Sequence, residues 1–234
     1  MSSQKGREIH GRAAKIREEG KHLEALQLQD EATLAYQKDK DILGLAEILA
    51  DRSLVLRHLF DETDDKNFLI IAKHEMMASV EMAEQSGSKE ALALPYFNLA
   101  KIQQDLEELD AAVSSYQKAV DSQTQNPTPE HNRPAVLLDM QIHLATCQYQ
   151  AGDKLALDRA LQALALLEEA NEVKYNKDVW LSGGHMRITQ ILKEDDPEKA
   201  AEHLQKAKEI IDANPDLKLR KGQWEKLAAS FKQN

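Results

Sequence analysis

The feature that most constrains this chain is the pattern of small and large apolar residues between Tyr96 and Val120. Small residues such as Ala100 and Ala112 recur among large ones at the spacing of two helices folded back on each other. Such a pair cannot bury its apolar faces alone, so neighbouring pairs must stack on it. The pattern therefore predicts a fold built from repeated helical hairpins.

A small residue also recurs early in the second helix of each expected hairpin, where a bulky side chain would hold the paired helices apart. These residues are Ala25, Ala72, Ala112, Ala156 and Ala200, at separations of 47, 40, 44 and 44 residues. Apolar periodicity predicts hairpins at about 7–38, 41–86, 89–124, 134–170 and 178–213, and a final helix over 218–232. Their component helices are expected at 7–19, 22–38, 41–60, 65–86, 89–106, 109–124, 134–150, 153–170, 178–193 and 197–213.

Composition favours an all-α fold. Hydrophobic residues make up 42% of the chain but aromatics only 5%, and Ala, Leu, Glu, Lys and Gln, which suit helices, are abundant. Few runs of β-branched residues remain from which to build strands, so none is expected. Gly20 and Gly152 are predicted to end first helices in the left-handed conformation. Three aspartates that follow turns are predicted N-caps: Asp110, Asp153 and Asp196.

The third hairpin resembles the tetratricopeptide repeat (TPR) family. Leu99-Ala100 supplies the large and small residues of its first helix, and Ala112, Tyr116 and Ala119 supply the series of the second. Because a standard TPR has about 34 residues, the longer spacing here is similar to the longer-armed variety. The resemblance implies a right-handed α-solenoid of about five hairpins, forming a single domain over 1–234. A HEAT-type solenoid is the alternative, and the Tyr116 series argues against it.

The last expected helix carries one apolar stripe, made of Trp224, Leu227 and Phe231. We expect this stripe to cap the fifth hairpin. A helix that docks a partner is the alternative, and the same stripe would serve self-association equally, so a homo-oligomer is left open.

First helices line the inner groove in the TPR family, so their open faces are the expected binding surface. The residues expected to meet a peptide or partner are Leu54, Arg57, Phe97, Asn98, Lys101, Gln104, Ile142, His143 and Tyr149. Asn98 and Lys101 are similar to the residues with which family members clamp a peptide carboxylate. Neighbouring faces supply only Arg57 and His143 to such a clamp. There are two alternatives to carboxylate capture. The groove could bind another kind of peptide or protein segment, or these polar residues could simply keep the helix face solvated.

Two short fragments could carry chemistry. Ser182-Gly183-Gly184-His185 lacks the preceding strand and the Lys-Ser or Lys-Thr ending of a phosphate loop, so close helix approach or a kink is the expected reason for its glycines. His143 and Cys147 stand at i and i+4, but two residues do not make a metal site, and a buried Cys147 is expected. We therefore expect no metal, no cofactor and no enzymatic activity.

The net charge of −10 disfavours general binding to nucleic acid. The single cysteine fits a reducing compartment, and no apolar stretch is long enough for a membrane span, so we expect a cytoplasmic protein without membrane contact. The expected function is a non-catalytic scaffold or adaptor that binds a protein or peptide in the groove. One alternative is a peptide-responsive regulator resembling bacterial pheromone receptors. The other is an enzyme, resting only on the two fragments above.

Overall fold

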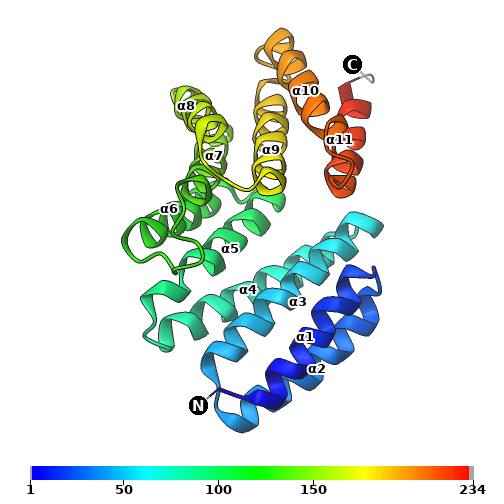
Figure 1. Ribbon diagram of the computed structural model, residues 1–234, viewed down its shortest axis with the longest axis vertical. Coiled ribbons are helices and arrows are strands. Elements are labelled where there is room, and N and C mark those ends of the chain that lie inside the picture. Colours follow the sequence, from blue (N-terminus) through cyan, green and yellow to red (C-terminus); the bar gives the residue numbers. More distant parts are fainter. Residues whose placement is uncertain (1, 232–234) are drawn as a thin grey trace. The chain divides into compact units, whose positions relative to one another are not determined.

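The structure is a computed structural model that describes residues 2–231. These residues form eleven α-helices and one short 3-10 helix, and they contain no strand (Figure 1). The prediction of an all-α fold is confirmed. Residue 232, the end of the expected capping helix, lies outside the described residues.

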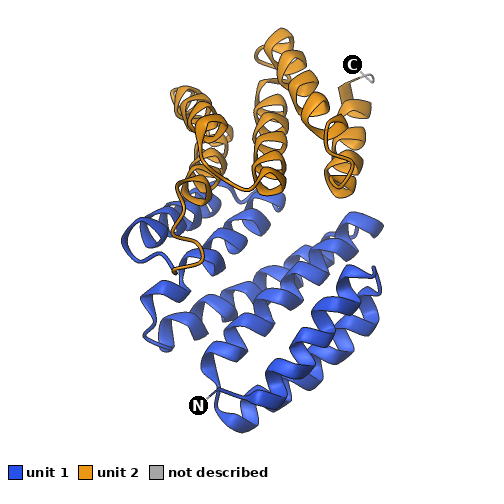
Figure 2. Cartoon of the chain, viewed as in Figure 1, with its two compact units in different colours: residues 1–128 blue, residues 129–234 orange. Residues whose placement is uncertain are grey.

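The chain divides into two compact units, residues 1–128 and 129–234 (Figure 2). The boundary falls within the Pro-containing segment 125–130, which follows the third hairpin. The first unit contains α1 (Gln4–Glu18), α2 (His22–Asp39), α3 (Ile42–Thr63), α4 (Lys66–Gln85), the 3-10 helix η1 (Lys89–Ala91), α5 (Ala93–Asp105) and α6 (Leu109–Gln125). The second contains α7 (Pro134–Gln150), α8 (Ala156–Glu169), α9 (Lys174–Leu192), α10 (Pro197–Asp212) and α11 (Lys218–Phe231).

Each unit is a stack of antiparallel hairpins in which the first helices form a layer. In the first unit α1 contacts α3 and α3 contacts α5, while α2 and α4 each pack on the following first helix. In the second unit α7 contacts α9, and α9 contacts α11. This is the arrangement of an all-α solenoid, as predicted, and it places the side chains of successive first helices next to one another.

The small residues used to measure the repeat lie in the interior of the protein. Ala25, Ala72, Ala112, Ala156 and Ala200 are all fully buried. Tyr116, the aromatic residue of the third hairpin, is fully buried as well. The residues that define the repeat spacing are therefore all buried.

Helix ends differ from the prediction where local caps act. Helix α1 begins at Gln4 because the Ser3 hydroxyl accepts a hydrogen bond from the backbone N–H of Gly6, at 3.0 Å. Asp196 caps α10 as predicted, but Asp110 lies inside α6, whose N-cap is Glu108. Three further helices begin at other residues than predicted: α5 at Ala93 rather than 89, α8 at Ala156 rather than 153, and α9 at Lys174 rather than 178. The predicted left-handed conformation is confirmed at Gly20, with φ 78°, and at Gly152, with φ 106°.

The first unit has a packing centre that the repeat pattern did not predict. Tyr36 of α2 is fully buried, and its ring lies against Gly6 of α1 and Gly44 of α3. Asp41 supports this contact, because one carboxylate oxygen accepts from the N–H of Gly44 at 2.9 Å and the other from that of Ser3 at 2.8 Å. Burial raises the pKa of Tyr36 to about 12.

Helix α11 packs on both helices of the fifth hairpin, as the capping prediction required. Trp224 and Leu227 pack against Met186, Ala207 and Ile211. The indole N–H of Trp224 also donates to the carbonyl of Leu204, at 2.9 Å. The stripe is therefore used within the second unit.

Replacing Gly44 by Ala should lower the free energy of unfolding by about 1–3 kcal/mol, the usual range for overpacking. An added Cβ would overlap Cδ1 and Cε1 of Tyr36, so the ring must move. Urea unfolding followed by circular dichroism measures the change. Gly11→Ala is the control, because Gly11 is exposed on α1 with nothing within 4 Å of the added atom. It should stabilise by about 0.5–1 kcal/mol, and equal effects at both positions would contradict the packing argument.

Candidate functional site

An ion pair joins the first helices α3 and α5 of the first unit. The Arg57 guanidinium donates to Oδ2 of Asp105 from Nη2 at 2.7 Å and from Nε at 3.1 Å. This fork joins successive first helices and keeps their faces in register. Leu54 and Asn98 are half-buried on these helices, and Leu94 is 40% exposed. The face thus offers apolar and polar groups side by side.

Three other predicted residues of α5 interact within the third hairpin. Phe97 is buried, and its ring meets the Tyr116 ring edge-on with centroids 5.6 Å apart. The Tyr116 hydroxyl donates to Oε1 of Gln104, at 2.9 Å. The half-buried Lys101 places its ammonium 5.2 Å from the centroid of Phe97. Phe97 and Gln104 therefore stabilise the hairpin, and Lys101 is held over an aromatic ring.

The predicted residues of α7 are buried, which corrects their expected placement on an open face. Ile142 is fully buried in the core of the second unit. His143 is 6% exposed, with Nε2 3.9 Å from Oδ1 of Asp139. The Tyr149 hydroxyl donates to Oδ2 of Asp195 at 2.5 Å, and its ring lies 4.1 Å from the Lys154 ammonium. A strongly apolar first helix such as α7 buries more of its surface than the groove argument assumed.

Gly183 and Gly184 lie in the middle of α9, where side chains of neighbouring helices reach the backbone. A Cβ at Gly183 would be 2.9 Å from Nη2 of Arg220 on α11. One at Gly184 would be 2.8 Å from Cδ1 of Leu164 on α8. Side chains of α8 and α11 therefore contact the α9 backbone at these two glycines.

The His143 and Cys147 fragment does not carry a reactive thiol. Cys147 is fully buried, and burial raises the pKa of its thiol to about 11, so the thiol is protonated at neutral pH. Within residues 2–231, no three His, Cys, Asp or Glu side chains form a group that could hold a metal ion. Nor is any helix in this part of the chain long and apolar enough to span a bilayer.

Two arginines on the first-helix face of the second unit were not identified from sequence. The Arg220 guanidinium occupies the notch at Gly183, and its Nε donates to the Val179 carbonyl at 3.2 Å. Arg187 follows one helical turn after Gly183 and is half-buried on the same face. The signal was available, because a glycine inside a helical pattern indicates a close neighbour, but nothing in the sequence named that neighbour.

The histidine of the glycine fragment pairs with a second histidine across the fifth hairpin. Nδ1 of His185 lies 2.8 Å from Nδ1 of His203, and both rings are buried. One nitrogen must donate and the other accept, so the two Nδ1 atoms cannot both carry a proton in the fold. Burial, followed by the His203 charge, lowers the pKa of His185 to about 3, and burial also lowers that of His203. The exposed Glu168, 3.7 Å from Nε2 of His185, does not offset this burial.

The free energy of unfolding should fall as the pH drops below the unfolded-state histidine pKa of about 6.5. Below this pH the histidines of the unfolded chain bind protons. The folded pair stays unprotonated until the pH reaches its lowered pKa, which is about 3 for His185. Each histidine contributes up to about 1.4 kcal/mol per pH unit. Urea unfolding between pH 7 and pH 5 measures the slope.

His203→Gln should reduce this slope because it removes one ring of the buried pair, whose pKa is lowered in the fold. His74→Gln, on the exposed face of α4, is the control and should leave the slope unchanged. A wild-type slope that survives His203→Gln in full would contradict the assignment.

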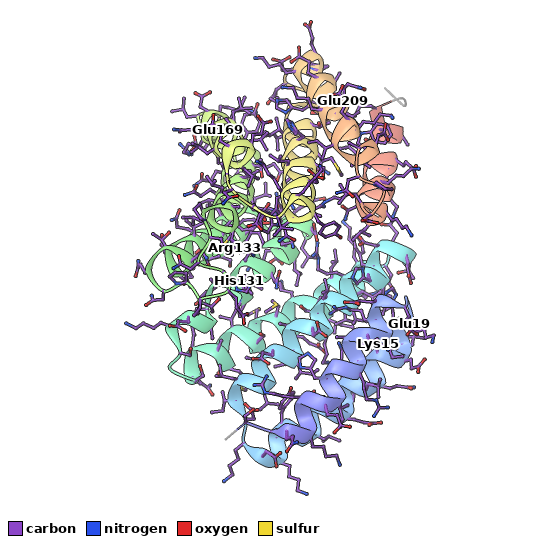
Figure 3. The ribbon with its side chains drawn as sticks, viewed as in Figure 1. Lys15, Glu19, His131, Arg133, Glu169 and Glu209 are labelled. Atoms are coloured by element: carbon purple, nitrogen blue, oxygen red, sulfur yellow. The ribbon has the colours of Figure 1, made fainter. Side chains whose placement is uncertain are left out.

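Acidic side chains are exposed on the second helices of this unit. Glu169 of α8 and Glu209 of α10 are both exposed, and Figure 3 labels them. The arginine pair belongs instead to the first helices, α9 and α11. The two layers of the second unit thus differ in the charges that they present.

Comparisons with known proteins locate the fold. No protein-family model and no curated protein matches the chain by sequence. The crystal structure of BtubC (BKLC) from P. vanneervenii is 22% identical with a TM-score of 0.62, and the match covers 86% of this chain and 77% of that one. A Podosopora anserina putative kinesin light chain with nearly identical TPR-like repeats is 15% identical with a TM-score of 0.63, over 89% of this chain and 96% of that one. The chain therefore has the fold of TPR-like repeat proteins, as the residues of its third hairpin predicted.

Proposed function

We propose that this chain is a non-catalytic scaffold that holds a peptide or a helix of a partner protein against its first helices. The observation that carries the proposal is the joined face of α3 and α5, which the Arg57 to Asp105 fork keeps in register. A repeat protein uses such a layer as an extended binding surface. The TPR-like fold supports this reading, and the single buried cysteine suits action in the cytoplasm.

The chemistry of this face fits an extended or helical segment with mixed polarity. Leu54 and the exposed Leu94 offer apolar contact. The Asn98 amide can both donate to and accept from a peptide backbone, and the Lys101 ammonium can orient a carboxylate. The proposed surface is therefore Leu54, Arg57, Leu94, Asn98 and Lys101, without the buried Ile142, His143 and Tyr149.

Lys101→Glu and Asn98→Ala should each weaken retention of partners by about tenfold, the effect of losing one charge-assisted or buried hydrogen bond. The chain, immobilised, is exposed to lysate, and retained proteins are compared quantitatively between variants. Helicity and the melting temperature should stay close to those of the wild type.

Lys118→Glu is the matched control. Lys118 makes the same kind of contact, with its ammonium 4.9 Å from the centroid of Tyr96, but it is exposed on α6, a second helix. The same change of charge and the same loss of a cation–π contact should leave partner retention unchanged. If Lys118→Glu and Lys101→Glu release the same proteins equally, the first-helix surface is not the binding site.

A further inference from the structure

The hairpin of α1 and α2 carries a groove that is open to solvent. The two helices pack on each other and on α3 (Figure 1). The groove between them has a volume of 400 Å³, and its floor includes the half-buried Ile16 of α1 and Leu28 of α2. Its other lining residues are exposed: Arg12, Lys15, Glu19, Glu24, Gln27 and Glu31. The hairpin thus presents to solvent a face of the kind on which hairpins of a repeat protein stack.

The two walls of the groove carry opposite charges: Arg12 and Lys15 on α1, and Glu24 and Glu31 on α2. Among the described residues, none of these four side chains takes part in an ion pair within 4.0 Å. Glu19, labelled in Figure 3, also lines the groove from α1, but its Oε2 lies 2.7 Å from Nζ of Lys21. The α1 wall is therefore basic, and the α2 wall is acidic.

This separation of charge makes the face complementary to a second copy of itself. A copy rotated by half a turn about an axis parallel to the helices places its α2 over α1 and its α1 over α2, so that each basic wall meets an acidic one. Lys15 and Glu24 both lie near the turn that joins the two helices, and they meet across such an interface. Arg12 and Glu31 both lie farther from this turn and meet in the same way. Rotation about an axis perpendicular to the helices would instead place α1 on α1 and oppose like charges.

Two leucines of α2 add apolar surface beside the acidic wall. Leu23 is 70% exposed and Leu34 is 66% exposed. Leu34 stands three residues after Glu31, and Leu23 stands four residues before Gln27, so helical spacing places both on the side of α2 that lines the groove. Covering such side chains stabilises an association in proportion to the apolar area removed from water.

We propose that the face of α1 and α2 binds a second copy of this chain in a two-fold dimer. Arg12 and Lys15 of each copy pair with Glu31 and Glu24 of the other, around the apolar floor of the groove. Apolar burial supplies most of the affinity, and the charges fix the orientation. The interface contains no residue of the proposed partner-binding surface on α3 and α5, so it is independent of the proposed function.

Sedimentation velocity of the full chain tests the dimer. We expect a reversible dimer whose dissociation constant increases with sodium chloride, because salt screens exposed charges. Arg12→Glu combined with Lys15→Glu makes both walls acidic, and Glu24→Lys combined with Glu31→Lys makes both walls basic. Each double variant should raise the dissociation constant at least about tenfold, because like charges then meet across the interface. Arg12→Gln combined with Lys15→Gln removes the charges without reversing them and should have a smaller effect in the same direction.

An equimolar mixture of the acidic and the basic double variant should restore the dimer. Each acidic wall then meets a basic wall of the other variant, a result that loss of the fold could not produce. Glu202→Lys combined with Glu209→Lys is the matched control, because these glutamates have the same spacing of seven residues and are exposed on the second helix α10. This control should sediment as the wild type does.

A wild type that sediments as a monomer up to its limit of solubility would overturn the proposal. A dimer that persists in the double variants would overturn it as well, and so would a mixture of folded double variants that stays monomeric. Circular dichroism of each variant establishes that it is folded. If no dimer forms while Lys101→Glu still releases partners, the scaffold function stands and the self-association does not.

Discussion

Close contact between helices at positions without bulky side chains is the constraint on which the structure depends. Each hairpin carries a fully buried alanine early in its second helix, and within each unit the second helix of one hairpin packs on the first helix of the next. A larger side chain at these points would separate the layers and expose apolar surface. The glycines of α9 extend the same rule, since one admits Leu164 and the other admits Arg220.

The sequence was sufficient to predict the fold class. The number of helices, their pairing in hairpins and the capping helix follow from periodicity. Apolar residues that recur every 3.6 positions and the alanines among them can be recognised in the sequence. Helix ends were less predictable, since Ser3 and Glu108 act as caps through local geometry that composition does not reveal. The burial of Ile142, His143 and Tyr149 was missed because an apolar helix has no polar face to indicate which side is open.

The charges of the second unit explain why its surface differs from that of the first. In the first unit Arg57 is paired with Asp105, so its charge serves the scaffold. In the second unit the Arg220 guanidinium lies against Gly183, and Arg187 is half-buried one helical turn further along α9. The sequence alone does not predict that Arg220 lies near the helix that carries Arg187, because 33 positions separate the two residues and only the packing of α11 on α9 brings these helices together.

The ring of Tyr36 lies between the third residues of two helices, and this has a consequence for how the chain can vary. Gly6 and Gly44 each lack a Cβ that would overlap the ring, and Asp41 links their N-terminal turns. A substitution at any one of the three positions changes the space available to the others. Natural variants of this protein should therefore exchange these residues as a set, with a smaller side chain at position 36 accompanying any larger one at 6 or 44.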